Sequence, residues 1–166
     1  MNKFRLKEVC KIYQPKTISK KDIIEGKYPV YGANGIIDYH VDYNHKSSEV
    51  VVGCRGIYPA VHLTKEYSWI NGNAMVITPL NIEQLSKKYL FYYLKSVDLT
   101  KYQTGSAIHQ ITKTTIQELE IKLPSLEEQE KIVEILNTID TMRDTMRDAM
   151  INAEKLLDSL LDIYLG

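Results

Sequence analysis

Residues 126–165 read LEEQEKIVEILNTIDTMRDTMRDAMINAEKLLDSLLDIYL, and this stretch decides how the chain is organised. It contains no Gly or Pro, and apolar or small residues recur in it at alternating intervals of three and four. That spacing places a heptad seam on one face of a helix, and such a seam needs a partner helix. At 1.5 Å per residue the helix would span roughly 60 Å. The seam residues are Ile132, Ile135, Ile139, Met142, Met146, Ala149, Ala153, Leu156, Leu160 and Ile163.

The residues before this stretch supply a helix start. Pro124 precedes it, Ser125 can cap it, and Glu128 completes a Ser-x-x-Glu capping box. No linker rich in Gly or Ser separates the helix from what comes before, so we expect a rigid joint. The predicted domains are a globule over residues 1–123 and a long spacer or dimerisation helix over 124–166. Because an unpaired seam would expose a large apolar stripe, we expect a homodimer held by a coiled coil.

The first 123 residues predict an α+β fold. Short β-branched or apolar runs at 49–53, 60–63 and 74–78 are bounded by Gly, Asn and Pro, which is typical of strands. Two further extended runs, 28–31 and 35–39, flank a Gly-Ala-Asn-Gly turn. The spacing of apolar residues predicts a helix over 82–95. A short helix over 115–119 and a short strand over 121–123 complete the prediction.

Charge is distributed unevenly along the chain. The 21 basic and 21 acidic residues balance overall, but from residue 124 onward only 4 are basic and 10 are acidic. Residues 1–123 therefore hold the other 17 basic and 11 acidic residues, a net charge of +6. The globule is suited to a polyanion such as double-stranded DNA, and the helix is not.

The two cysteines and the hydropathy pattern indicate a compartment. Cys10 and Cys54 lie far apart and form no CxxC pair, which favours a reducing environment and disfavours a structural zinc site. We find no apolar leader at the N-terminus and no apolar run of 18 residues. We therefore expect a cytoplasmic protein without membrane association.

Searches for catalytic motifs argue against an enzyme. The glycine-rich cofactor loop and the Asn/Asp-Pro-Pro-aromatic motif of a methyltransferase are both missing from the sequence. Glu25-Gly-Lys27 and Glu120-Ile-Lys122 fit the final step of a nuclease motif but lack the upstream Pro-Asp partner. We find no Ser-His-Asp elbow or P-loop. The histidines, which are His40, His45, His62 and His109, are scattered, so we expect no metal ligands and no catalytic residues.

Three polar loops with glycines are candidates for reading DNA. They lie at 31–35, 53–58 and 104–113. Arg, Asn, Gln and Ser pair with base edges, and Lys pairs with phosphate. The alternative is that these glycines only allow tight turns. The predicted DNA-binding residues are Tyr31, Asn34, Arg55, Tyr58, Ser106, His109, Gln110 and Lys113.

Several of these segments resemble a known family. They are Tyr28-Pro-Val-Tyr-Gly-Ala-Asn-Gly-Ile-Ile37, Val51-Val-Gly-Cys-Arg-Gly56 followed by Trp69-Ile-Asn-Gly-Asn-Ala-Met-Val76, the loop within 103–111, and Leu123-Pro-Ser-Leu-Glu-Glu-Gln-Glu-Lys-Ile-Val133. Together they resemble the DNA specificity (S) subunit of type I restriction–modification systems over essentially the whole chain. The step from Pro124 through Gln129 into the long helix is the most specific match.

The resemblance implies a division of labour. It implies a target-recognition domain over residues 1–123 and a spacer helix over 125–165, with no catalysis in this chain. Methyltransferase (M) subunits would bind S-adenosylmethionine, and a restriction (R) subunit would join to cleave DNA. A standard S subunit carries two such domains and two helices, whereas this chain has one of each. We therefore expect a half-subunit that reads one half-site, with the helix that ends at Gly166 completing the module.

Two other functions remain compatible with these residues. The chain could be an interaction module that joins or blocks a full S or M subunit and has little sequence preference of its own. It could also be a recognition domain taken from a larger fused enzyme. Salt-dependent, sequence-selective DNA binding in the presence of the M subunit would distinguish the main hypothesis from the first alternative.

Overall fold

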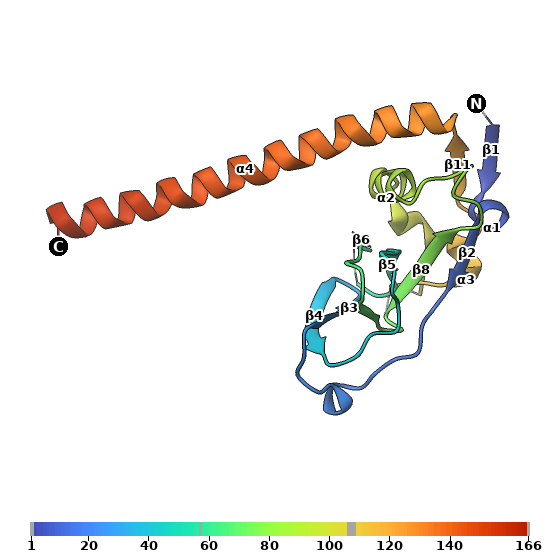
Figure 1. Ribbon diagram of the computed structural model, residues 1–166, viewed down its shortest axis with the longest axis horizontal. Helices are drawn as coiled ribbons and strands as arrows, with labels where there is room; N and C mark the ends of the chain where they lie inside the picture. The colour runs from blue at the N-terminus through green and yellow to red at the C-terminus, as the bar shows by residue number, and fades with distance from the viewer. Residues whose placement is uncertain (1, 57, 106–108, 166) are drawn as a thin grey trace. The chain divides into compact units, whose positions relative to one another are not determined.

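The computed structural model describes residues 2–56, 58–105 and 109–165, and the chain divides into two compact units. One unit runs to Gln129 and the other begins at Glu130. The predicted α+β class with a long C-terminal helix is confirmed (Figure 1). The domain boundary predicted after residue 123 lies before the first turn of the C-terminal helix. In the structure that first turn belongs to the globular unit.

A four-stranded antiparallel sheet forms the centre of the globular unit. Its order is β2-β8-β5-β6. The strands are β2 (Cys10–Tyr13), β5 (Val50–Gly53), β6 (Val61–Leu63) and β8 (Ala74–Pro79). The strands predicted over 49–53, 60–63 and 74–78 correspond to β5, β6 and β8, and each observed end lies within one residue of the predicted end. Val50, Val51 and Val52 are all fully buried, which explains why β5 is a continuous apolar run.

A second sheet has the order β4-β3-β7. β3 (Tyr28–Gly32) and β4 (Gly35–His40) correspond to the two extended runs predicted on either side of the turn, and they pair as an antiparallel hairpin. Gly35 closes its turn with a φ of 108°, a value that an L side chain rarely adopts. The short β7 (Trp69–Ile70) pairs with β3 in parallel and was not predicted.

The remaining elements are short. β1 (Asn2–Arg5) pairs with β11 (Glu120–Leu123), and β9 (Gln103–Thr104) pairs with β10 (Gln110–Ile111). The predicted short helix over 115–119 is α3, which begins and ends earlier, at Lys113–Ile116. Neither α1 (Leu6–Val9) nor the 3-10 turns η1 (Lys20–Asp22) and η2 (Leu99–Tyr102) was predicted.

The second helix begins later than its apolar spacing predicted. α2 spans Lys87–Ser96, so the prediction was wrong for residues 82–86. Ser86 caps α2 by accepting a hydrogen bond from the Tyr89 amide at 3.1 Å. Upstream, Asn81 forms a separate turn in which its side-chain oxygen accepts from the Glu83 amide at 2.8 Å. Two capping residues in quick succession therefore divide what reads as one periodic segment.

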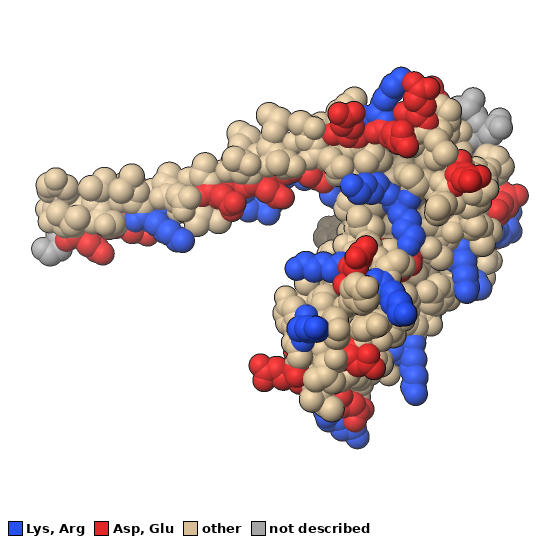
Figure 2. All heavy atoms as spheres, viewed as in Figure 1, with Lys and Arg blue, Asp and Glu red and all other residues tan. Residues whose placement is uncertain are grey.

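The long helix α4 spans Leu126–Leu165, and its predicted start is confirmed. The Ser125 amide donates to Glu128 Oε2 at 3.0 Å, and the Glu128 amide donates to Ser125 Oγ at 3.3 Å, which together form the capping box. Over the half of α4 nearer the C-terminus, Figure 2 shows charged side chains along one side of the helix and uncharged residues along the other. The seam residues are all exposed, from 38% at Ile132 to 71% at Met146 among the large ones.

Candidate nucleic-acid interface

Two of the three predicted loops meet at the end of β5. The Cys54 amide donates to the Asn73 carbonyl at 2.8 Å, and the Cys54 carbonyl accepts from the Ile111 amide at 2.9 Å. Arg55 and Gln110 form an isolated antiparallel bridge. The loop that presents Arg55 is therefore held directly beside the β9–β10 hairpin. We call this edge of the globular unit the reading edge.

The β3–β4 turn joins the same edge. A side chain at Gly53 would place its Cβ only 2.3 Å from the carbonyl oxygen of Ala33. Gly53 is therefore needed because another part of the backbone approaches it closely. Asn34 follows Ala33 in this turn and is exposed. The three loops predicted separately from the sequence thus lie next to one another.

Most of the predicted contact residues face solvent on this edge. Tyr58 is 79% exposed. The exposed members are Asn34, Arg55, Tyr58, His109 and Lys113, and Gln110 is half-buried. The carboxamide of Gln103 donates to the Gly56 carbonyl at 2.6 Å and braces the Arg55 loop. Ser106, also predicted, lies outside the described residues.

Tyr31 does not present a free surface. It is only 5% exposed, and its hydroxyl accepts a hydrogen bond from the Lys65 amide at 3.0 Å. The ring belongs to the core because both faces of β3 are covered, with every residue from Pro29 to Gly32 buried. This burial does not fit the predicted contact with DNA, so we leave Tyr31 out of the proposed contact set.

The reading edge is supported by two side-chain amides that sequence reasoning missed. Gln14 Nε2 contacts Cys54 Sγ at 3.2 Å and the Gly72 carbonyl at 3.0 Å. The buried Asn71 donates to the Ile18 carbonyl at 3.2 Å and accepts from the Gly72 amide at 2.9 Å. Asn71 is part of the Asn-Gly-Asn segment that resembles the family, whereas nothing local in the sequence distinguishes Gln14.

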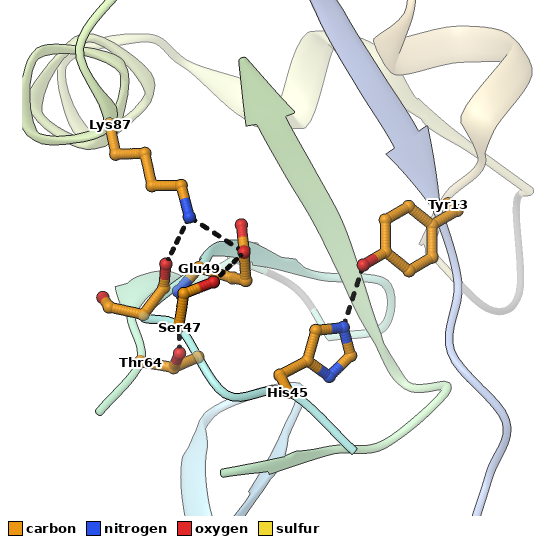
Figure 3. Close-up of polar contacts among 7 residues, drawn as sticks. Tyr13, His45, Ser47, Glu49, Thr64 and Lys87 are labelled. Atoms are coloured by element: carbon orange, nitrogen blue, oxygen red, sulfur yellow. Dashed lines mark hydrogen bonds and ion pairs between the residues drawn. The ribbon is translucent and has the colours of Figure 1, made fainter. Parts of the chain in front are cut away.

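A polar cluster near the other end of β5 holds the sheet to α2 (Figure 3). Lys87 Nζ donates to Glu49 Oε1 at 2.8 Å and to the Ser48 carbonyl at 2.7 Å. Glu49 Oε2 is buried without a hydrogen-bond partner among the described atoms. The Lys87–Glu49 ion pair is partly buried. Removal of either residue would therefore leave the charge of the other poorly solvated and without its partner.

His45 and Tyr13 form the second half of this cluster. Their rings stack with centroids 6.1 Å apart, and Tyr13 Oη lies 2.9 Å from His45 Nε2. Burial lowers the pKa of His45 and raises the pKa of Tyr13. Both groups are therefore neutral near pH 7, which suits a structural contact.

Neither a metal cluster nor a membrane span is found where the structure describes the chain. In those residues no three His, Cys, Asp or Glu side chains gather as metal ligands would. No described helix is both long and apolar enough to cross a bilayer.

Comparison with known proteins identifies the family. The type I restriction modification DNA specificity domain matches residues 1–154. The chain is 29% identical over 143 residues to the type I restriction enzyme EcoprrI specificity subunit of Escherichia coli, covering 82% of this chain and 35% of that protein. It is 27% identical over 123 residues to a putative type I restriction enzyme specificity subunit of Haemophilus influenzae, covering 72% and 31%. The chain belongs to the type I restriction–modification DNA specificity family.

Solved structures share the fold. The S subunit of a type I restriction–modification system from M. genitalium superimposes with a TM-score of 0.78 at 19% identity, covering 95% of this chain and 44% of that one. The HsdS subunit of Thermoanaerobacter tengcongensis gives 0.66 at 22% identity, covering 89% and 39%. The chain thus spans about a third to a half of the length of these relatives.

Proposed function

We propose that this chain is the non-catalytic DNA-recognition component of a type I-like restriction–modification or methyltransferase complex. The convergence of three polar loops at the reading edge is the observation that carries the proposal. Five exposed predicted side chains and the half-buried Gln110 come from these loops, and residues 1–123 have a net charge of +6 from 17 basic and 11 acidic residues. Such an edge suits entry into a DNA groove.

The chemistry of these side chains suits them to different parts of the DNA. Arg55 can donate two hydrogen bonds to a guanine edge, and the amides of Asn34 and Gln110 can pair with adenine. Lys113, at the first turn of α3, is suited to a phosphate. His109 and Tyr58 supply a further donor and a stacking face. Specificity would therefore come from the two loops that the bridge between Arg55 and Gln110 holds together.

We further propose that two chains pair through the seam of α4. The exposed seam supports this, because such a stripe is normally covered by another helix. An isologous pair has a two-fold axis, so the two reading edges would read the same sequence on opposite strands. The recognised site is then an interrupted inverted repeat. M subunits would supply S-adenosylmethionine and methyl transfer, and an R subunit would supply cleavage.

The recognition claim is tested with the chain bound to its M subunit. Arg55→Ala should relax discrimination at one base position by about 1–3 kcal/mol, while Lys113→Ala should weaken binding to every sequence alike. Lys88→Ala, an exposed lysine of α2, serves as the control. If neither Arg55→Ala nor Lys113→Ala changes DNA binding, the reading edge has been assigned to the wrong surface.

The exposed seam also supports an alternative, in which the chain is an interaction module without sequence preference. The double variant Ile139→Asp with Met146→Asp distinguishes the main proposal from this alternative. Under the main proposal the double variant loses the dimer and the bipartite site, and each monomer still prefers its half-site over a scrambled one. Under the alternative, wild-type protein binds its protein partner and shows no preference between target and scrambled DNA.

A further inference from the structure

A hollow in the globular unit brings Lys113 of the third loop together with two lysines outside the loops considered so far, Lys7 and Lys11. It has a volume of about 390 Å³ and lies between β2 and the α3 region. Its polar lining includes Lys7, Lys11, Lys113 and Gln117, and Cys10, Ile12, Tyr13 and Leu80 complete the lining. No carboxylate is among its described lining residues. We call this site the lysine hollow.

The ammonium groups of the hollow are only partly neutralised. Lys7 Nζ lies 2.7 Å from Glu118 Oε1, but the other oxygen of that carboxylate lies 2.6 Å from Arg5 Nη1. Glu118 is thus shared between two cations. Lys11 Nζ lies 5.3 Å from the centre of the Tyr13 ring. In the described part of the chain, neither Lys11 nor Lys113 forms an ion pair.

The balance of charge favours an anionic ligand. Glu8, the other nearby carboxylate, accepts from the Arg5 amide within the α1 cap. Three lysines line the hollow, while Glu8 and Glu118 are engaged by Arg5 and Lys7. Like charges that share one opening repel one another unless an anion lies between them. The amide of Gln117 adds a neutral donor that suits a phosphate oxygen.

The lysine hollow adjoins the reading edge along two paths. Lys113 follows Ile111 by two residues, and the Ile111 amide donates to the Cys54 carbonyl. At no more than roughly 3.6 Å per residue, the Cα atoms of Ile111 and Lys113 lie within about 7 Å of each other. On the other side Gln14, which follows β2, contacts Cys54 Sγ at 3.2 Å. A DNA strand at Arg55 is therefore within reach of the hollow.

We propose that the lysine hollow is a phosphate-binding site that holds the DNA backbone while the loops read the bases, an inference that rests on the proposed function. Lys11 and Lys113 supply ammonium groups that form no ion pair among the described residues, and Lys7 is paired with Glu118. Contacts of this kind set the position of a protein on DNA without carrying sequence information. They also make affinity depend on salt, because each neutralised phosphate releases counterions.

The test measures binding of the complex with the M subunit to a target duplex and to a scrambled duplex over a range of salt concentrations. Lys11→Ala should reduce the slope of log affinity against log salt by about 0.9. The same slope predicts a loss of roughly fivefold at 0.15 M salt, equal for both duplexes. Lys11→Arg should restore both quantities, and Lys88→Ala should change neither. Melting curves of each variant verify that the fold is retained.

The outcomes separate this inference from the proposed function. If the wild-type complex prefers its target and Lys11→Ala binds with unchanged affinity and salt slope, the phosphate site is refuted while DNA recognition stands. A change in the ratio of target to scrambled affinity would also overturn it, since phosphate contacts affect both duplexes equally. Failure of the wild-type complex to discriminate between the duplexes would reject both ideas.

Discussion

Gln129 is predicted to hold the first turn of α4 to the globular unit of which it is part. Its side chain is fully buried and makes three hydrogen bonds. Nε2 donates to the Gln84 carbonyl at 2.8 Å and to the Pro124 carbonyl at 3.1 Å, and Oε1 accepts from the Ser86 amide at 3.0 Å. Gln129→Leu keeps a similar volume but leaves one donor and two acceptors without partners.

The expected cost follows from those three groups. An unsatisfied buried polar group costs about 1–3 kcal/mol, and carbonyls that retain some access to water lie at the lower end. We therefore expect Gln129→Leu to lower the free energy of unfolding by about 3 kcal/mol. For a chain of this size that corresponds to a fall in Tm of about 6–12 °C. Fluorescence of Trp69, the single tryptophan, reports on the globular unit without interference from α4.

Gln84→Leu is the matched control. Its own side chain is exposed, and only its backbone carbonyl takes part in the network, so all three hydrogen bonds survive. We expect a change within about 0.5 kcal/mol. If Gln129→Leu melts within 2 °C of the wild type at equal protein concentration, roughly one-third of the smallest expected shift, the network does not stabilise the unit as argued.

Three further predictions concern the globular unit. Gly53→Ala should destabilise it by about 1–3 kcal/mol in urea denaturation, because the new Cβ would lie 2.3 Å from the Ala33 carbonyl oxygen; unchanged stability would refute the close approach. Lys87→Met should cost about 3–5 kcal/mol in the same assay by leaving Glu49 unpaired, and the double variant that adds Glu49→Gln should recover part of that loss. Burial raises the pKa of the Cys10 thiol to about 12, so iodoacetamide at pH 8 should label it only on unfolding. Since the folded pKa is the higher one, this thiol favours the fold fully below about pH 8.5 and progressively less as the pH rises toward 12; rapid labelling of native protein at pH 8 would count against its burial.

The sequence predicts those elements whose signals are local. α4 follows from its heptad spacing and from the capping pair Ser125 and Glu128, and β5 follows from a run of valines. β1 could not be found this way, because Lys3 and Arg5 give it the appearance of a charged surface segment. Its partner β11 lies more than a hundred residues away, and pairing over that separation leaves no local pattern.

The residues of the candidate site likewise fall into those that local sequence signals could predict and those that they could not. Glycines around Asn34 and Arg55 mark exposed loops, so these residues were within reach of sequence reasoning. The burial of Tyr31 was not, since consecutive residues of β3 from Pro29 to Gly32 are all buried, and the short sequence does not reveal that both faces of this strand are covered. The lysine hollow joins Lys11 of β2 with Lys113 of α3, and only the folded chain brings these distant residues together.

The central claim is that each chain reads one half-site and that α4 pairs two chains. Mapping of methylated adenines in DNA from cells that express this chain with its M subunit tests the claim most directly. We predict one interrupted inverted repeat with identical halves about one helical turn apart, roughly 34 Å between their centres. Removal of seven residues from α4, one heptad, should narrow the gap by up to roughly 10 Å and leave both halves unchanged. A continuous or asymmetric methylated sequence would contradict the account.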